Sequence, residues 1–270
     1  RALFSKPAYN PERFSSGMTT SEFAELRGNV HRPLVDKTVY ETFYPGSIFK
    51  PFSAFAALSN HSTDFEERIR CEGTYRLGGI VYGCTQAHRS VDLGTAIARS
   101  CNVFFYHLAE RLGLDPVSEV SRDFGFSERT GIGLNDEAAG LVPTRDWYEQ
   151  RRVPWRLGFA LNTAIGQGDT RVTPLQVAMA YAAIANGGDV LVPYVVNQIR
   201  DQEGQVIEQG QRQVRRHVHL DPATLDFMVD SLRRGVNETG GTAFAAHIEG
   251  GFSIAGKTGT AQITGRTRTL

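Results

Sequence analysis

A serine and a lysine whose spacing suits nucleophilic chemistry stand at positions 47 and 50, within the stretch 44–51 (YPGSIFKP). The proline and glycine at 45 and 46 predict a turn, and apolar residues then recur at the spacing of a helix with one buried face. Ser47 is therefore expected at the start of a helix that runs to about residue 59, where free backbone N–H groups favour developing negative charge. Lys50 lies on the same face, and Pro51 falls in the first turn, where its missing N–H costs little. A hydroxyl held beside an amine can act as a nucleophile with its base.

The same pair has an ordinary structural interpretation, in which Ser47 caps the helix and Lys50 is solvated. A lysine acts as a base only when it is neutral, and its ordinary pKa is about 10.4. The chemical interpretation therefore requires burial or a neighbouring cation to lower the pKa of Lys50. Other parts of the chain must surround this amine if it is a base.

Two further short motifs follow in order along the chain, Ser100-x-Asn102 and Lys257-Thr258-Gly259. The first falls in a break between helices expected at 93–99 and 103–112, and the second lies in a glycine-containing strand expected at 252–262. Each motif has a plain alternative, because Asn102 could cap the following helix and Lys257 could be an exposed strand residue.

Composition and charge exclude some classes of function. The 270-residue chain is 41% hydrophobic and 21% charged, which is typical of a globular protein. Lys plus Arg and Asp plus Glu both number 29, so the zero net charge gives no indication of a nucleic-acid partner. No apolar run reaches the roughly 18 residues that span a bilayer. Because the chain begins with neither a signal peptide nor a Met, we expect a domain of a longer protein.

The expected elements divide the chain into a helical middle and strand-rich ends. Helices are predicted at about 116–124, 176–185 and 222–234 besides those above, and strands at 2–7, 190–199, 205–208 and 252–262. This order favours an α/β fold with an all-α insert. Sheet parts are expected at about 1–45 and 188–270, and the helical part at about 46–187.

Taken together, the three motifs resemble those of penicillin-binding proteins and class A β-lactamases. The chain is most similar to the transpeptidase domain of class B penicillin-binding proteins, and within that family to the elongation-type penicillin-binding protein 2 group. The supporting stretches are 44–51, 100–106 (SCNVFFY), 130–132 (TGI), 165–168 (IGQG), 173–176 (TPLQ), 185–188 (ANGG) and 256–262 (GKTGTAQ). The segment between Trp147 and Trp155 favours the elongation type over the division type.

The resemblance implies a fold and a location. It implies a β-lactamase/transpeptidase-like antiparallel sheet flanked by helices, with a helical subdomain. Family members continue past the Lys-Thr-Gly strand with two strands and a C-terminal helix, and they carry an N-terminal pedestal and a membrane anchor. We therefore expect this chain to lack those parts and to be the periplasmic domain of a single-pass inner-membrane protein.

The reaction implied by the resemblance is acyl transfer onto a serine. Ser47 attacks the penultimate D-alanine of a peptidoglycan stem peptide, neutral Lys50 takes its proton, and an amine from a neighbouring stem resolves the acyl-enzyme. Ser100 relays a proton to the leaving amine, and Asn102 holds Lys50 and the substrate amide. No cofactor is needed for this chemistry.

The third motif is expected to bind the substrate carboxylate. Thr258 and Thr260 provide hydroxyls, Lys257 adds positive potential and lowers the pKa of Lys50, and Gly259 allows close approach. Backbone N–H groups of Ser47 and Thr260 would form the oxyanion hole, where one donor is worth on the order of 10²–10³ in rate. Glu137 is expected to fix a chain connection rather than to activate water.

A second constellation consists of Cys71, Cys84, His88 and Cys101. Three thiols and an imidazole suit a closed structural zinc site, although their spacing is not that of a zinc finger. Some elongation-type relatives carry a zinc beside the active site, and His88 and Cys101 match two of its ligands in position. The alternatives are a Cys71–Cys84 disulfide, as an oxidising compartment permits, or free thiols.

Two other functions on the same scaffold are a serine β-lactamase and a non-catalytic β-lactam sensor. The first needs a deacylating base for which the sequence has no obvious context, and the second would stay acylated. The partners implied by the resemblance are peptidoglycan stem peptides, β-lactam antibiotics, a membrane glycan polymerase and elongation-complex proteins, and no nucleic acid.

Overall fold

The helix that begins at Lys50 lies at the centre of the computed structural model, which describes residues 2–134 and 136–261. Helix α3 (Lys50–Ser59) continues directly from a 3₁₀ turn, η1 (Gly46–Phe49), and its first eight residues are buried. Pro51 occupies the first turn of α3, so the predicted helix start is confirmed.

Aromatic side chains attach α3 to its neighbours. Phe52 packs against Phe124 and Phe126 with ring centroids 5.1 and 4.9 Å apart, and Phe55 stacks on Phe124 at 5.2 Å. These rings are fully or almost fully buried, and each such large apolar side chain stabilises the fold by about 1.5–3 kcal/mol. The core therefore fixes the axis of α3 and, with it, the positions of residues 47 and 50.

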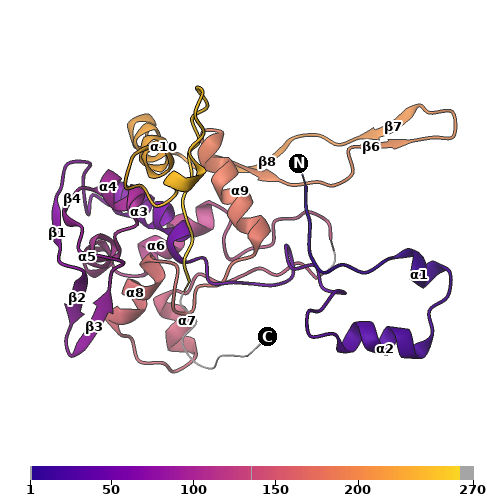
Figure 1. Ribbon diagram of the computed structural model, residues 1–270, viewed down its shortest axis with the longest axis horizontal. Helices are drawn as coiled ribbons and strands as arrows, with labels where there is room; N and C mark the ends of the chain where they lie inside the picture. The colour runs from indigo at the N-terminus through magenta and orange to yellow at the C-terminus, as the bar shows by residue number, and fades with distance from the viewer. Residues whose placement is uncertain (1, 135, 262–270) are drawn as a thin grey trace.

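Helices surround α3 (Figure 1). Helices α5, α6, α10 and α4 contact α3, α8 packs on α5, and α10 also packs on α4 and α9. The helices besides α3 and η1 are α1 (Glu12–Ser15), α2 (Thr20–Gly28), α4 (Leu93–Ala98), α5 (Asn102–Leu112), α6 (Asp115–Asp123), α7 (Arg145–Gln150), α8 (Leu157–Ala164), α9 (Pro174–Ala185), α10 (Pro222–Asn237) and η2 (Phe244–Ala246). No helix in the described ranges is both long and apolar enough to cross a bilayer.

The strands pair only two by two within residues 2–134 and 136–261. Four antiparallel pairs form, β1 with β4, β2 with β3, β5 with β8 and β6 with β7. The strands are β1 (Ile69–Cys71), β2 (Thr74–Leu77), β3 (Ile80–Gly83), β4 (Arg89–Val91), β5 (Asp189–Val192), β6 (Gln198–Arg200), β7 (Val206–Gln209) and β8 (Gln213–His217).

The single large sheet expected from the two chain ends is not found among the described residues. Residues 2–7 and 252–261 form no strand, and residue 262 lies outside the described part. The second of these runs is attached to α10 instead, since Gly256 N donates to Leu232 O at 3.1 Å and Asn237 Nδ2 donates to Ile254 O at 2.7 Å. A strand requires a neighbouring strand to satisfy its backbone groups, and here a helix takes that place.

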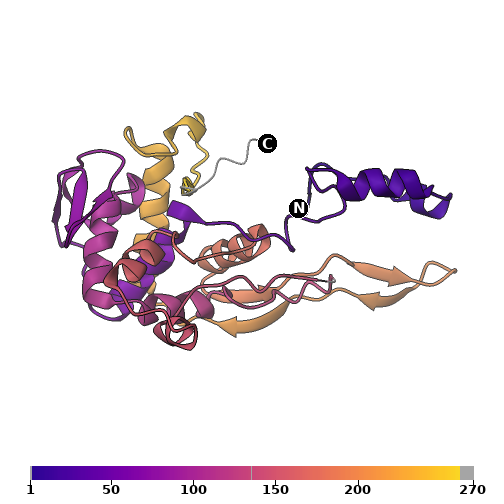
Figure 2. The ribbon, with the colours of Figure 1, turned by 90° about the horizontal axis from the view of Figure 1, so that it is seen from below.

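The β6–β7 ribbon and the N-terminal helices project from the helical body. Both views show the ribbon extending well beyond the helical body around α3, and α1 and α2 extend to the same side (Figures 1 and 2). The chemistry-bearing residues of the three motifs lie in the body.

Candidate active site and metal-ligand cluster

Ser47 lies on the η1 turn, whose backbone is fixed by close contacts. Gly46 N donates to Gly166 O at 2.8 Å. Gly46 has φ +56°, and a Cβ on it would lie 2.2 Å from Thr260 O. Only glycine fits such a site, so the turn lies directly against residues 166 and 260. Ser47 itself is half-buried.

The Lys50 side chain is fully buried and joins the first two motifs. Its Nζ donates to Ser100 O at 2.8 Å, to Ser100 Oγ at 3.1 Å and to Asn102 Oδ1 at 2.7 Å. The protonated form of this amine would use all three of its N–H donors here. The structure thus brings together side chains that are 50 and 52 residues apart in sequence.

The loop between α4 and α5 presents Ser100 in an uncommon conformation. Ser100 has φ +57°, which costs a non-glycine residue of the order of 1–2 kcal/mol. Asn102 is the first residue of α5, while the N-cap position is Cys101, which makes no side-chain cap. The alternative in which Asn102 caps this helix is therefore wrong, because its Oδ1 accepts from Lys50 and its Nδ2 donates to Gly83 O at 3.0 Å.

The third motif lies beside the η1 turn that carries Ser47, although not as a strand. A Cβ on Gly259 would lie 3.2 Å from Ile48 Cγ2, so the backbone of residue 259 is adjacent to η1. Lys257 is half-buried, and its Nζ donates weakly to Thr258 O and Oγ1 at 3.3 and 3.4 Å. All three motifs therefore meet around the first turn of α3.

A threonine that belongs to no motif supports the third motif. Thr242 Oγ1 accepts from Thr258 Oγ1 at 2.7 Å, and Thr242 N donates to Ala98 O at 3.1 Å. This residue links the 256–260 run to the end of α4. Nothing in its sequence context indicates this role.

Burial determines the proton affinity of the two amines. Burial, followed by the positive charge of Lys257, lowers the pKa of Lys50 to about 7. Burial lowers the pKa of Lys257 to about 8. Both pKa values thus lie far closer to neutrality than that of a solvated lysine, which meets the requirement set by the sequence for Lys50 as a base.

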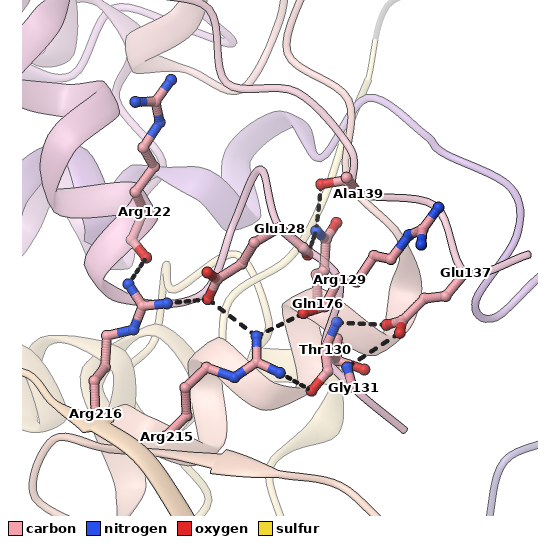
Figure 3. Close-up of polar contacts among 10 residues, drawn as sticks. All are labelled: Arg122, Glu128, Arg129, Thr130, Gly131, Glu137, Ala139, Gln176, Arg215 and Arg216. Atoms are coloured by element: carbon pink, nitrogen blue, oxygen red, sulfur yellow. Dashed lines mark hydrogen bonds and ion pairs between the residues drawn. The ribbon is translucent and has the colours of Figure 1, made fainter. Parts of the chain in front are cut away.

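A polar network holds the connection between α6 and α7 (Figure 3). The buried Glu137 carboxylate accepts from Thr130 N at 2.6 Å and from Gly131 N at 3.1 Å. Gln176 Nε2 donates to Glu128 O and to Ala139 O at 2.8 and 2.7 Å. These contacts agree with the expectation that Glu137 fixes a chain connection.

Two arginines of β8 complete this network from the other side (Figure 3). Arg215 donates to Arg129 O and Thr130 O, and Arg216 donates to Arg122 O and forms an ion pair with Glu128. The β8 strand and the connection are thereby held as one unit.

Short backbone bridges lead from this connection to the η1 turn that carries Ser47. Leu141 pairs with Arg171, and Val172 pairs with Phe43, in successive antiparallel bridges. The Arg171 guanidinium lies 3.2 Å from the ring centroid of Tyr44, which precedes the turn. The network thus helps to fix the backbone of residues 43–44, which lead into the turn that carries Ser47.

The four candidate metal ligands gather beside the Ser100 loop. Their ligand atoms all lie within 4.8 Å of one another, and Cys71, His88 and Cys101 are buried while Cys84 is half-buried. His88 Nδ1 lies 3.6 Å from Cys71 Sγ and 3.4 Å from Cys84 Sγ. Tetrahedral zinc, with Zn–S of about 2.3 Å and Zn–N of about 2.0 Å, separates such atoms by about 3.5 Å. The residues therefore fit a closed site of this kind.

The thiols are free in this arrangement, so a Cys71–Cys84 disulfide is not present. A hydrogen bond from Cys101, together with the N–H groups of Val103 and Asn102, lowers the pKa of Cys84 to about 3. The same pairing and burial raise the pKa of Cys101 well above its ordinary range. The Cys84 sulfur thus lies at the N-terminus of α5, where it accepts from Asn102 N at 3.1 Å, and such an environment favours the thiolate that binds metals.

Known proteins resemble the chain over almost its full length. The family model for the penicillin binding protein transpeptidase domain matches residues 1–269. The peptidoglycan D,D-transpeptidase MrdA of Acinetobacter baumannii is 32% identical over 276 residues, covering 97% of this chain and 39% of that protein.

Solved structures show the same likeness. PBP2 of Pseudomonas aeruginosa, in complex with WCK 5153, is 32% identical, with a TM-score of 0.86 over 96% of this chain and 59% of that one. PBP2 of Helicobacter pylori, in complex with MreC, is 27% identical, with a TM-score of 0.85 over 96% and 48%. Penicillin-binding protein A of M. tuberculosis, as a ceftriaxone acyl-enzyme complex, is 27% identical, with a TM-score of 0.83 over 97% and 57%.

The matches cover almost all of this chain but less than half of each curated relative. The chain spans 39% to 42% of the length of three curated relatives named MrdA. The family model nevertheless covers all but one residue of the chain. Lys50 joins the first two motifs, the third lies beside η1, and the sequence and the fold both match known transpeptidase domains. This chain therefore belongs to the penicillin-binding protein transpeptidase domain family.

Proposed function

We propose that this chain is the catalytic domain of a peptidoglycan D,D-transpeptidase that cross-links stem peptides in cell elongation and shape and is acylated by β-lactams. The observation that carries the proposal is the set of contacts from Lys50 Nζ to Ser100 and Asn102, which places a buried amine of lowered pKa one turn from Ser47. Relatives named peptidoglycan D,D-transpeptidase support it.

In the proposed reaction Ser47 Oγ attacks the carbonyl carbon of the penultimate D-alanine, and neutral Lys50 takes the hydroxyl proton. The bond to the terminal D-alanine breaks, and Ser100 Oγ, which contacts Lys50 at 3.1 Å, passes a proton to the departing nitrogen. The amine of a second stem then attacks the ester and releases Ser47.

The remaining residues of the motifs bind the substrate and orient it for attack. Asn102 holds Lys50 and the substrate amide, and Thr258 and Thr260 bind the substrate carboxylate within the positive potential of Lys257. Gly259 allows the close approach, and the N–H groups of Ser47 and Thr260 stabilise the oxyanion.

A turnover assay tests the function. The protein is incubated with a stem pentapeptide and a second stem as acceptor, and D-alanine release and dimer formation are followed by mass spectrometry. We expect both products, and neither from Ser47→Ala. Rapid release of hydrolysed penicillin without peptide product would indicate a β-lactamase, and a lasting penicillin adduct without peptide turnover would indicate a sensor.

The β-lactamase alternative has little support from Glu137. Both oxygens of its carboxylate accept hydrogen bonds from the backbone of the 130–131 turn. A carboxylate engaged in this way is a structural anchor, so it is not poised to activate a deacylating water.

We also propose that the Cys71, Cys84, His88 and Cys101 cluster binds a structural zinc ion. Its support is the close approach of four soft donors, with His88 Nδ1 turned toward two sulfurs. A bound zinc ion would supply no chemistry to acyl transfer, but it would hold Cys101 between Ser100 and Asn102.

Removal of the metal should increase the mobility of the loop formed by residues 100–102. We expect about one zinc per chain by elemental analysis, and stripping it with a chelator should lower the melting temperature by several degrees and slow penicillin acylation. Restoring zinc should reverse both effects. Absence of zinc from purified protein, or unchanged melting after chelation, would contradict the site.

The pH dependence of acylation should follow the two amines. Since Lys50 acts when neutral and Lys257 when charged, the rate should rise as pH passes about 7 and fall above about 8. In Lys257→Arg, which keeps its charge at all working pH values, the alkaline fall should disappear while the acid limb stays. In Lys257→Ala the acid limb should move to higher pH, because a neighbouring charge that lowers the Lys50 pKa is gone. An acid limb that stays in place in Lys257→Ala would contradict this coupling.

Thr242→Val should weaken acylation without abolishing it. The change keeps the shape of the side chain but removes the acceptor for Thr258 Oγ1. One hydrogen bond of about 0.5–1.5 kcal/mol corresponds to a loss of roughly 2- to 12-fold in the second-order rate constant. Thr242→Ser keeps the hydroxyl and should react nearly as the parent does, and equal loss in both variants would indicate a packing role instead.

Partners and location follow from the family by analogy. The PBP2 of Helicobacter pylori has been solved with MreC, which supports elongation-complex proteins as partners of the full protein here. We propose a periplasmic location, with a membrane glycan polymerase supplying the strands to be cross-linked.

The domain division is likewise a proposal. Sheet parts at about 1–45 and 188–270 would enclose the helical part at about 46–187, with the run 252–261 in the second sheet part. Its position between α10 and η1 supports this division. Slow amide exchange along 252–261 would be the expected sign.

A further inference from the structure

The three cysteines beside the active site differ in access and in contacts. Cys71 and Cys101 are fully buried, whereas Cys84 is half-buried. Cys84 Sγ accepts a hydrogen bond from Asn102 N at 3.1 Å, at the first residue of α5. Reactive cysteines are typically partly exposed and lie at helix N-termini, and of the three only Cys84 meets both conditions.

We propose that Cys84 is a redox modification site, which forms a disulfide with Cys101 when the cluster holds no metal and thereby uncouples Ser100 and Asn102 from Lys50.

Contacts favour Cys101 over Cys71 as the partner. Cys84 Sγ is held at 3.1 Å by the N–H of Asn102, the residue that follows Cys101. The ligand atoms of the cluster all lie within 4.8 Å of one another, so a local contraction brings the two sulfurs to the S–S length of about 2.05 Å. Cys71 Sγ is held on the other side of the cluster, 3.6 Å from both Gln86 O and His88 Nδ1.

The oxidant is a small-molecule disulfide such as oxidised glutathione, and the step is thiol–disulfide exchange. The Cys84 sulfur attacks one glutathione sulfur, the glutathione S–S bond breaks, and the first glutathione leaves as a thiolate. The Cys101 sulfur then attacks the Cys84 sulfur and expels the second. The two cysteines lose two electrons and two protons in total, and the two glutathione sulfurs gain them.

The Cys84–Cys101 disulfide would displace the 100–102 loop, because Cys101 lies between Ser100 and Asn102. A disulfide sulfur is a poor acceptor, so the Asn102 N–H loses its partner and residues 100–102 shift. Lys50 then loses acceptors that now lie 2.7 to 3.1 Å away. A displacement of about 1 Å in such a site costs on the order of 10²-fold in rate.

The test uses the whole chain after chelation, incubated with oxidised glutathione and digested without reductant. We expect a peptide pair linked through Cys84 and Cys101, its loss in dithiothreitol, and slower formation in zinc-loaded protein. Cys71→Ser should still form the link, whereas Cys84→Ser and Cys101→Ser should not. If a variant fails to fold, the linked peptides of the parent protein alone identify the pair.

Activity is a second and separate readout, because the disulfide can be detected whether or not the proposed transferase function holds. The oxidised parent protein should react with fluorescent penicillin on the order of 10²-fold more slowly and recover in reductant. Thiols that stay free after chelation and oxidation, or a link through Cys71, would overturn the assignment. A Cys84–Cys101 link that leaves acylation unchanged would overturn the coupling to the catalytic loop.

Discussion

Ser47→Ala should abolish covalent labelling by penicillin, with a loss on the order of 10⁶ in rate, as for other enzymes that lose their nucleophile. The backbone of the η1 turn does not depend on this hydroxyl, since Gly46 N is bound to Gly166 O and α3 is anchored by its buried phenylalanines. The variant should therefore fold and melt like the parent.

The measurement is intact mass after incubation with a fluorescent penicillin, together with a melting curve. Ser59→Ala, at the exposed end of the same helix, is the matched control and should label normally. An adduct that persists in Ser47→Ala, or that maps to another residue in the parent, would exclude Ser47 as the nucleophile.

Lys50→Met should slow acylation by on the order of 10²–10⁴, the usual contribution of a general base. Methionine fills much of the same buried volume but leaves Ser100 O and Asn102 Oδ1 without their common donor. Unpartnered buried acceptors cost about 1–3 kcal/mol each, so some loss of stability is expected as well, while the removal of a buried amine offsets part of it.

Lys50→Arg separates the proton-transfer role from the positioning role. Arginine keeps donors for the Ser100 loop but cannot give up its proton in a protein. Acylation should stay at the level of Lys50→Met even if the melting temperature recovers, as followed by stopped-flow labelling beside thermal melting. Near-parental rates in Lys50→Arg would show that Lys50 only positions the loop.

The local part of the site could be predicted from the sequence. Apolar spacing after Pro45-Gly46 predicted a helix start at Ser47, as observed. A break at 100–102 was predicted between two helices, and the observed break covers 99–101, with Asn102 the first residue of α5. The helix predicted at about 222–234 begins where expected, because Asp221 caps it and Pro222 is its first residue. These predictions succeed because they depend on residues within one or two helical turns of each other.

Features that depend on residues distant in the sequence could not be predicted from local patterns. The run 252–262 was predicted as a strand, but strand formation is decided by a neighbour that no local pattern identifies, and the described residues 252–261 pack on α10 instead. Thr242 was missed because its role arises only where α4 and the third motif meet.

Helix caps in the sequence mark the starts of some helices that were not predicted. Helix α2 begins with a capping box between Thr19 and Glu22, a local pattern from which this helix could have been predicted. Helices α7 and α8 were not predicted, although Thr144 caps α7 by accepting from Trp147 N at 3.1 Å. Short helices between glycine-rich turns give too few repeats for periodicity alone.

Residues 46, 166 and 260 meet through their main chains, with no room for a side chain at Gly46 or Gly166. Main-chain atoms are the same in every residue type, so a point mutation can alter this contact only by displacing it. An inhibitor that takes its hydrogen bonds from these main-chain groups would therefore be hard to evade by substitution, and drug escape would have to arise through residues farther from the nucleophile.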